Sequence, residues 1–181
     1  LVVIGMIAAL AGISFPVYKS IQKKVDKQQA EMLVNSLEIA IDNFVTEYNY
    51  LPYWQAAYPS GVDTGAYDDD GHKIITVLMG LGNTCNFKAI QFFTTSMEAK
   101  DNKNGIVISG TNAYLYDKWG NAYGFRMDYD QNGVIPSPYN GAQLISGLNS
   151  LILTKGADKL WYRWESTEYD EVLNWDWDGS Y

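Results

Sequence analysis

The first 18 residues contain no charged side chain, and this uncharged segment constrains the fold more than any other feature of the sequence. At about 1.5 Å per residue, a helix of this length spans about 27 Å, close to the roughly 30 Å hydrocarbon thickness of a bilayer. No glycine or proline occurs in residues 17–50, and Pro52 supplies a stop. We therefore expect one helix of about 48 residues, kinked or locally melted near Gly12 to Pro16, because Pro16 has no N–H to donate.

Three roles are possible for the uncharged segment. A cleaved secretory signal carries basic residues before its apolar stretch and a small-residue cleavage site after it. Here the lysines follow the apolar stretch, and residues 14–18, with the sequence SFPVY, form a poor cleavage site. A buried core helix usually mixes polar residues into one face. The pattern favours a retained hydrophobic helix.

Charge is distributed unevenly along the chain. The formal net charge is −8, but residues 1–31 carry a net charge of +2 and residues 32–181 a net charge of −10. The positive charge comes from a basic collar that consists of Lys19, Lys23, Lys24 and Lys27. An acidic chain lacks the basic surface that nucleic-acid binding requires, so no nucleic-acid partner is expected. A basic flank normally stays in the cytoplasm, yet the head lies on the same side of the segment as the collar.

Beyond the collar the helix is expected to be amphipathic and to carry a small head. Apolar residues recur there at helical spacing, namely at Val17, Ile21, Val25, Ala30, Leu33, Val34, Leu37, Ile41, Phe44, Val45 and Tyr48. Short β-rich runs predict strands near 105–110, 113–116, 122–127 and 151–153. We expect an α+β fold, in which a small antiparallel β-sheet head with extended loops packs on the C-terminal half of the helix.

Three segments resemble one protein family. Residues 1–16, with the sequence LVVIGMIAALAGISFP, and the long helix after them resemble the N-terminus of type IV pilins and type II secretion pseudopilins. Residues 117–123, DKWGNAY, are similar to the Asp-Pro-Trp-Gly-Asn-Pro-Tyr segment of major (G-type) pseudopilins, and residues 152–158, ILTKGAD, to the strand and turn that follow it there. Lys118 and Ala122 replace the two prolines, so the motif residues that carry over are Asp117, Trp119, Gly120, Asn121 and Tyr123.

The resemblance implies a pilin-like fold and a structural subunit of a helical filament, either a type II secretion pseudopilus or a type IV pilus-like fibre. It divides the chain into a transmembrane and filament-core helix (1–18), an amphipathic continuation (19–51) and a globular head (52–181), with a variable insertion (53–115) and a β-sheet and C-terminal loop region (105–181). The partners implied are further copies of the chain, a prepilin peptidase and an assembly platform in the bacterial inner membrane. The expected location is that membrane before assembly, and afterwards a periplasmic or extracellular filament.

The resemblance also implies two properties of the N-terminal segment. The family's methylated Phe and its Glu would precede Leu1, so we expect an N-terminally truncated sequence whose missing leader sets the topology despite the collar. Helix contacts would replace lipid contacts during assembly, and small residues let helices approach closely. The residues expected at this filament-core interface are Val2, Ile4, Gly5, Ala8, Ala9, Gly12, Phe15 and Pro16.

Calcium is the expected cofactor, at one of two acidic clusters. Asp128, Asp130 and Asn132 follow the first half of a calcium-binding loop, in which alternating oxygens converge on one hard cation. A plain hairpin turn is the alternative, since the Glu that completes an EF-hand loop is replaced by Tyr139. Major pseudopilins are thought to fix their C-terminal loop with calcium, and the positions that the resemblance suggests here are Asp158, Asp176 and Asp178, unless these are simply solvated carboxylates. The single cysteine excludes an intramolecular disulfide, which leaves such a stabilising role open to metal.

No enzymatic activity is expected. The sequence has one histidine, His72, and lacks a glycine-rich phosphate loop and a Ser-based nucleophile motif, and Cys85 is expected to be a buried or idle thiol. Aromatic residues gather in two places, Tyr48, Tyr50, Tyr53, Trp54 and Tyr58 near the helix end, and Trp161, Tyr162, Trp164, Tyr169, Trp175 and Trp177 in the tail. We interpret them as anchors at subunit interfaces. The alternative function is a membrane-anchored, non-polymerising module that binds glycans through this Tyr/Trp-rich head.

Overall fold

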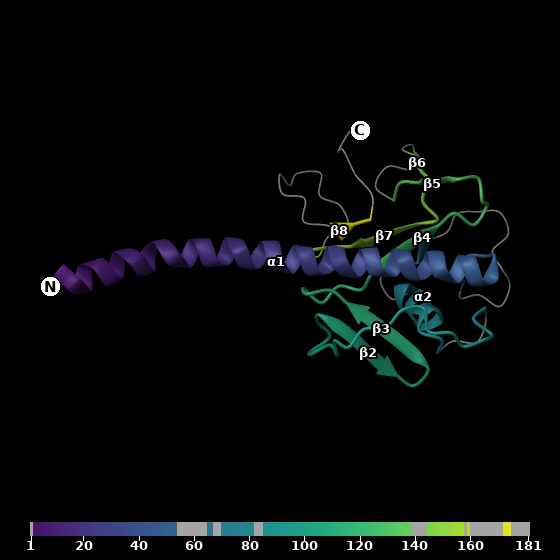
Figure 1. Ribbon diagram of the computed structural model, residues 1–181, viewed down its shortest axis with the longest axis horizontal. Helices are drawn as coiled ribbons and strands as arrows, with labels where there is room; N and C mark the ends of the chain where they lie inside the picture. The colour runs from purple at the N-terminus through teal and green to yellow at the C-terminus, as the bar shows by residue number, and fades with distance from the viewer. Residues whose placement is uncertain are drawn as a thin grey trace.

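The computed structural model shows one long helix running along a head of small antiparallel sheets (Figure 1). This helix, α1 (Val2–Tyr48), projects from the head at its N-terminal end. The α+β class and the long N-terminal helix predicted from the sequence are therefore confirmed. The structure describes residues 2–53, 65–66, 70–81, 85–138, 144–157, 159 and 172–174, and among these it leaves the side chains of residues 2, 4–17, 65 and 66 undescribed.

The end of α1 is set by a change in backbone conformation. Asn49 has a φ of 59°, a left-handed conformation that asparagine tolerates better than most residues. Its N–H donates to the carbonyl of Val45 at 2.7 Å and closes the last turn. The helix thus ends at Tyr48, before Pro52 and before the expected boundary at residue 51. Helical backbone runs through Pro16 without the expected local melting, and Figure 1 shows a gentle curve in this part.

The C-terminal half of α1 buries one face in the head. The buried residues follow helical spacing and are Ala30, Val34, Leu37, Ala40, Ile41, Phe44 and Tyr48. Full burial of each large apolar side chain stabilises the fold by about 1.5–3 kcal/mol. This line of contacts fixes the helix on the head.

The largest sheet of the head contains four antiparallel strands in the order β1-β4-β7-β8. These strands are β1 (Gly65–Ala66), β4 (Gly124–Met127), β7 (Ser150–Thr154) and β8 (Val172–Leu173). All residues of β7 are buried, because this strand lies between β4 and β8 and also contacts α1. The strands expected near 122–127 and 151–153 are therefore confirmed.

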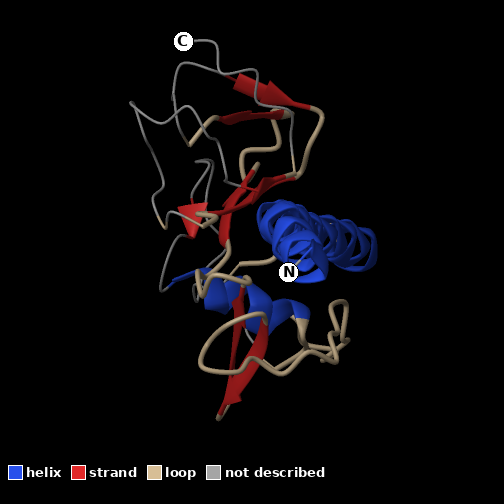
Figure 2. Cartoon of the chain, turned by 90° about the vertical axis from the view of Figure 1, so that its left-hand side faces the viewer, coloured by secondary structure: helices blue, strands red, loops and turns tan. Residues whose placement is uncertain are grey.

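Two hairpins and a short helix complete the described head. β2 (Gly105–Ser109) pairs with β3 (Asn112–Tyr116), and β5 (Val134–Pro136) pairs with β6 (Leu144–Ser146). The short helix α2 (Gly71–Leu78) packs against β3. Figure 2 shows α1 end-on, between the four-stranded sheet on one side and α2 with the β2–β3 hairpin on the other. One flank of α1 stays uncovered in this view.

Candidate functional site

A buried carboxylate organises the loop between β3 and β4. Asp117 is 0% exposed, and its Oδ1 accepts the backbone N–H groups of Trp119 at 2.9 Å and Asn121 at 2.7 Å. Its Oδ2 accepts the side-chain amide of Asn121 at 2.8 Å and the hydroxyl of Thr154. A carboxylate can be buried only where hydrogen bonds replace its hydration. These donors therefore make Asp117 the centre of the loop.

The same loop is tied to the end of β7. The amide of Asn121 also donates to the carbonyl of Gly156 at 2.7 Å, next to Thr154. Gly120 has a φ of +91°, and a Cβ at this position would lie 3.2 Å from the carbonyl oxygen of Asn102. Only glycine adopts this backbone without strain. The two head segments that resemble the family are thus brought together into one hydrogen-bonded unit.

Tyr123, the last residue of the predicted motif, lies in the core beside this unit. Its ring is 1% exposed, and its hydroxyl has no hydrogen-bond partner among the described residues. Burial, and to a lesser extent the charge of Asp117, raises the pKa of Tyr123 far above its usual value. Together with His72 and Tyr114, whose rings stack at 4.5 Å, Tyr123 lines a cavity of about 70 Å³. A cavity of this size holds only a few water molecules.

The candidate calcium loop forms a closed turn. The two carboxylate oxygens of Asp128 accept the N–H groups of Asn132 at 3.1 Å and Gly133 at 2.9 Å. Asp130 accepts the backbone N–H of Asn132 at 3.0 Å and its side-chain amide at 2.7 Å. The amide oxygen of Asn132 accepts the N–H of Val134 at 2.8 Å. The structure thus brings the oxygens of the three predicted metal ligands, Asp128, Asp130 and Asn132, together in one Asx-type turn.

The electrostatics of this turn are compatible with a cation. Burial raises the pKa of Asp128, the N–H of Gly133 lowers it, and the neighbouring Asp130 raises it again. Two carboxylates and an amide oxygen are ligands that calcium prefers, although calcium takes six to eight oxygens in all. Within the described ranges, no group of three acidic, histidine or cysteine side chains is placed to hold a metal ion. The second predicted cluster, formed by Asp158, Asp176 and Asp178, lies outside the described residues.

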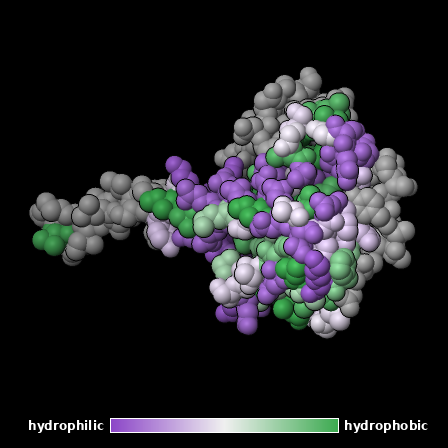
Figure 3. Space-filling view, turned by 45° about the vertical axis from the view of Figure 1, so that its right-hand side comes forward, coloured by the Kyte–Doolittle hydropathy of each residue, from purple (hydrophilic) through white to green (hydrophobic). Residues whose placement is uncertain are grey.

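One line of large apolar side chains on α1 faces away from the head. This outer stripe consists of Tyr18 (67% exposed), Ile21 (56%), Val25 (39%), Met32 (69%) and Ile39 (61%). At 100° per residue, the stripe lies roughly opposite the buried Val34 and Leu37. Figure 3 shows hydrophobic patches along the helix with hydrophilic residues beside them. Apolar residues scattered over a surface are normal, whereas a row of them along one helix face suits contact with another helix.

The N-terminal third of α1 carries the residues expected in the filament core. Val3 is 68% exposed there. The side chains of Val2, Ile4, Gly5, Ala8, Ala9, Gly12, Phe15 and Pro16 are outside the described residues, although their backbone is helical. In the part of the chain that could be searched, no helix is long and apolar enough to cross a membrane.

Comparisons of the chain with protein-family models, with curated proteins and with solved structures found no match.

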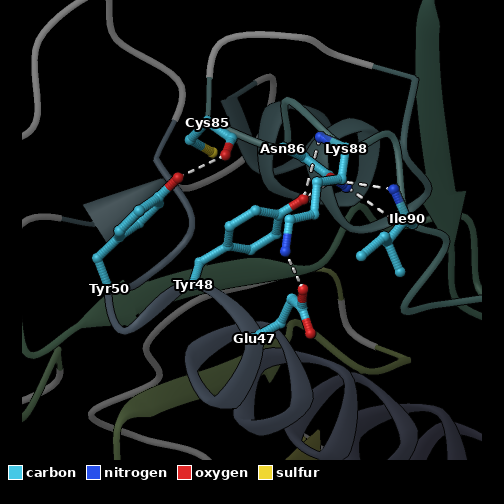
Figure 4. Close-up of polar contacts among 7 residues, drawn as sticks. All are labelled: Glu47, Tyr48, Tyr50, Cys85, Asn86, Lys88 and Ile90. Carbon is cyan, nitrogen blue, oxygen red and sulfur yellow. Dashed lines mark hydrogen bonds and ion pairs between the residues drawn. The ribbon is translucent and has the colours of Figure 1, made fainter.

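Aromatic residues at the end of α1 form a packed cluster (Figure 4). Tyr48 is 8% exposed, its ring lies 4.6 Å from that of Phe44, and its hydroxyl donates to Oδ1 of Asn86 at 2.7 Å. The amide of the buried Asn86 donates to the carbonyls of Val77 at 2.8 Å and Ile90 at 2.7 Å. The Tyr48 ring is thus committed to packing and offers no face for a sugar. The sequence contains no signal for the role of Asn86, because an asparagine in a loop usually marks only a turn.

Cys85 and Tyr50 take part in packing and hydrogen bonding within the head. Cys85 is buried, as expected, and its thiol donates to the carbonyl of Tyr53 at 3.2 Å, while burial raises its pKa. The hydroxyl of Tyr50 donates to the Cys85 carbonyl at 2.7 Å (Figure 4). The other aromatic residues of the two predicted groups lie outside the described residues: Trp54, Tyr58, Trp161, Tyr162, Trp164, Tyr169, Trp175 and Trp177.

Proposed function

We propose that this protein is a structural subunit that polymerises into a helical filament through α1, in the manner of type IV pilins and pseudopilins. The observation that carries this proposal is the outer stripe on the uncovered flank of α1. Burial of each large apolar side chain in a helix contact would contribute about 1.5–3 kcal/mol. Association costs several kcal/mol of lost motional freedom, so a line of such residues is needed rather than one.

The spacing of the stripe supports packing of helix on helix. Tyr18, Val25, Met32 and Ile39 follow one another at intervals of seven residues. A seven-residue repeat keeps an apolar line facing a partner helix at a shallow crossing angle, with a drift of about 20° per repeat. A contact between non-equivalent positions of successive copies produces a helical filament when the rotation between copies does not close into a ring.

The uncharged N-terminal segment would serve in the same assembly. Before polymerisation it would lie in the inner membrane, and in the filament it would pack against its copies through Gly5, Ala8, Ala9 and Gly12. The resemblance supplies the pilin-like fold, the prepilin peptidase, the assembly platform and the periplasmic or extracellular location. A secretion pseudopilus and a surface pilus-like fibre both fit this role.

Calcium is the proposed cofactor of the head. Asp128, Asp130 and Asn132 would hold it, and it would supply positive charge to two carboxylates that lie close together. The hydrogen bonds of Asn132, Gly133 and Val134 already orient these oxygens within one turn. The metal would therefore stabilise the loop without taking part in a reaction.

Introduction of negative charge into the stripe tests the filament proposal. Met32→Glu with Ile39→Glu should abolish fibres in material sheared from cells, because a carboxylate in an apolar helix contact loses its hydration. The matched control is Ile108→Glu, since Ile108 is 55% exposed but lies on β2. Electron microscopy and the sedimentable fraction report assembly, and melting of the detergent-solubilised chain reports folding.

The outcomes separate assembly from folding. Loss of fibres with an unchanged melting temperature supports the role of the stripe. Normal fibres from the doubly substituted chain would show that α1 does not contact its copies through this face, and the proposal would then fail.

A further inference from the structure

Lysines gather at the end of the head from which α1 emerges. We name them the neck surface and define it as Lys19, Lys23, Lys24 and Lys27 on α1, Lys100 and Lys103 before β2, Lys118 in the motif loop, and Lys155 and Lys159 after β7. The segments 19–27, 98–104, 117–121 and 155–159 carry a net charge of +4, against −12 for the rest of the chain. All nine lysines are exposed or half-buried. Positive charge is therefore concentrated in these four segments of the sequence.

Contacts between these segments place them at one level of the helix. Lys118 Nζ lies 3.7 Å from Oδ1 of Asp26 on α1. A Cβ on Gly120 would lie 3.2 Å from the side chain of Lys103, so the loop before β2 touches the motif loop. The Asn121 amide joins the motif loop to the end of β7. In Figure 1 the ends of β3 and β7 lie on the side of the head toward the N-terminus.

Lys19, Lys23 and Lys27 of the collar lie on the side of α1 that faces the head, whereas Lys24 lies nearer the outer stripe. At 100° per residue, Lys19 and Lys23 lie on the face of α1 that carries Val34 and Leu37, just N-terminal to the head. The outer stripe occupies the opposite face. The outer stripe and the basic face thus lie on opposite sides of α1, and the basic face lies next to the loop lysines of the neck surface.

The axial position of the neck surface matches the polar layer of a bilayer. Asp26, the contact of Lys118, lies eight residues after Tyr18, which is about 12 Å along the helix. The headgroup layer on each side of the hydrocarbon core is roughly 5–8 Å thick, and charges act over a further 8–10 Å at physiological salt. A lysine side chain bridges the remaining distance. The neck surface would therefore meet lipid phosphates when residues 1–18 span the core.

We propose that the neck surface binds the phosphates of anionic phospholipids and seats the head on the membrane before assembly. This inference rests on the membrane stage of the proposed function. A lipid surface fits better than an acidic face of a second copy, because the lysines begin where the uncharged segment ends and lie within about 12 Å of it along the helix. The outer stripe stays free for helix contacts while the basic face is engaged.

Hydrogen exchange of the full chain in lipid nanodiscs tests this proposal. Discs of phosphatidylcholine are compared with discs that also contain one quarter phosphatidylglycerol. Residues 98–104 and 117–121 should exchange several-fold more slowly in the anionic discs, and 0.5 M NaCl should remove the difference. Each lysine near an anionic surface strengthens binding to that surface about fivefold. The triple variant Lys100→Gln, Lys103→Gln and Lys118→Gln should therefore lower the affinity of the neck surface for anionic lipid by roughly 100-fold. Lys73→Gln with Lys88→Gln is the control outside the neck surface.

The results separate this proposal from the proposed function. If the chain enters both kinds of disc and exchanges equally in them, the neck surface does not bind anionic lipid. The proposal that residues 1–18 lie in the membrane before assembly would be unaffected by that result. Failure of the chain to enter either disc contradicts the membrane stage as well. If the triple variant keeps its lipid effect but no longer forms fibres, the neck surface binds a second copy and the lipid proposal is wrong.

Discussion

Replacement of Asp117 is expected to destabilise the head more than any other single change in the motif loop. Its carboxylate accepts the N–H groups of Trp119 and Asn121, the amide of Asn121 and the hydroxyl of Thr154, all in a region without solvent. Asp117→Ala removes the acceptor for each of them. Asp117→Asn keeps Oδ1 but places an amide donor opposite two further donors.

The expected loss in the free energy of unfolding follows from the buried hydrogen-bond donors that lose their acceptor. A buried donor without an acceptor costs about 1–3 kcal/mol. Four donors lose their acceptor in Asp117→Ala, and partial relaxation of the loop lowers the sum, so we expect a cost of about 3–5 kcal/mol. For a chain of this size, 1 kcal/mol shifts the melting temperature by about 2–4 °C, so the expected decrease is about 6–20 °C. Asp117→Asn should cost roughly 1–3 kcal/mol.

Near-UV circular dichroism of the full chain in detergent micelles measures this effect, because Trp119 lies in the affected loop. Asp101→Asn is the matched control, since Asp101 is exposed and asparagine tolerates its left-handed backbone, with φ of 53°. The control should melt as the original chain does. An Asp117→Ala variant that melts within about 2 °C of the original chain would show that these hydrogen bonds do not stabilise the head, because that shift corresponds to less than about 1 kcal/mol.

Three further predictions concern the calcium loop and the helix end. EGTA should lower the melting temperature of the head by a few degrees, and Asp130→Ala should abolish that difference; an unchanged melt in the original chain would contradict the site. In EGTA, the raised folded-state pKa of Asp128 means that its contribution to stability is fully present below pH 3.8 and is lost as the pH rises through that higher pKa. Melting temperatures measured across this range should therefore decline less in Asp128→Asn, and parallel curves would contradict this. Asn86→Ala should cost about 2–4 kcal/mol because Asn86 is buried and bonds Tyr48, Val77 and Ile90; urea unfolding measures this, and a cost below about 0.5 kcal/mol would be inconsistent with these bonds.

The sequence predicted the helix and the central strands because their signals are periodic. The apolar spacing through Val34, Leu37 and Phe44 identified the buried face of the C-terminal half of α1, and the apolar run from Leu151 to Leu153 identified a strand. Periodicity does not fix where a helix ends. The left-handed backbone at Asn49 ended α1 earlier than Pro52 would have, and this depends on one residue's tolerance for positive φ.

Contacts between residues close in sequence could be predicted at the candidate sites, but contacts between distant residues could not. The donors Asp128, Asp130 and Asn132 are close in sequence, so a local turn was enough to bring them together. The contacts of Asn121 with Gly156 and of Asn86 with Tyr48 join residues far apart in the chain, and no local pattern encodes them. The outer stripe was not predicted: Tyr18, Met32 and Ile39 were outside the expected apolar line, and Ile21 and Val25, which were expected on the same face as Val34, are exposed on the opposite face.

Electron microscopy of material sheared from cells that express the unmodified chain tests the proposed polymerisation through α1. We expect helical fibres composed of this protein, with the long helices along the fibre axis and the heads outside. Material that contains only detergent-soluble monomers or closed dimers would contradict this proposal.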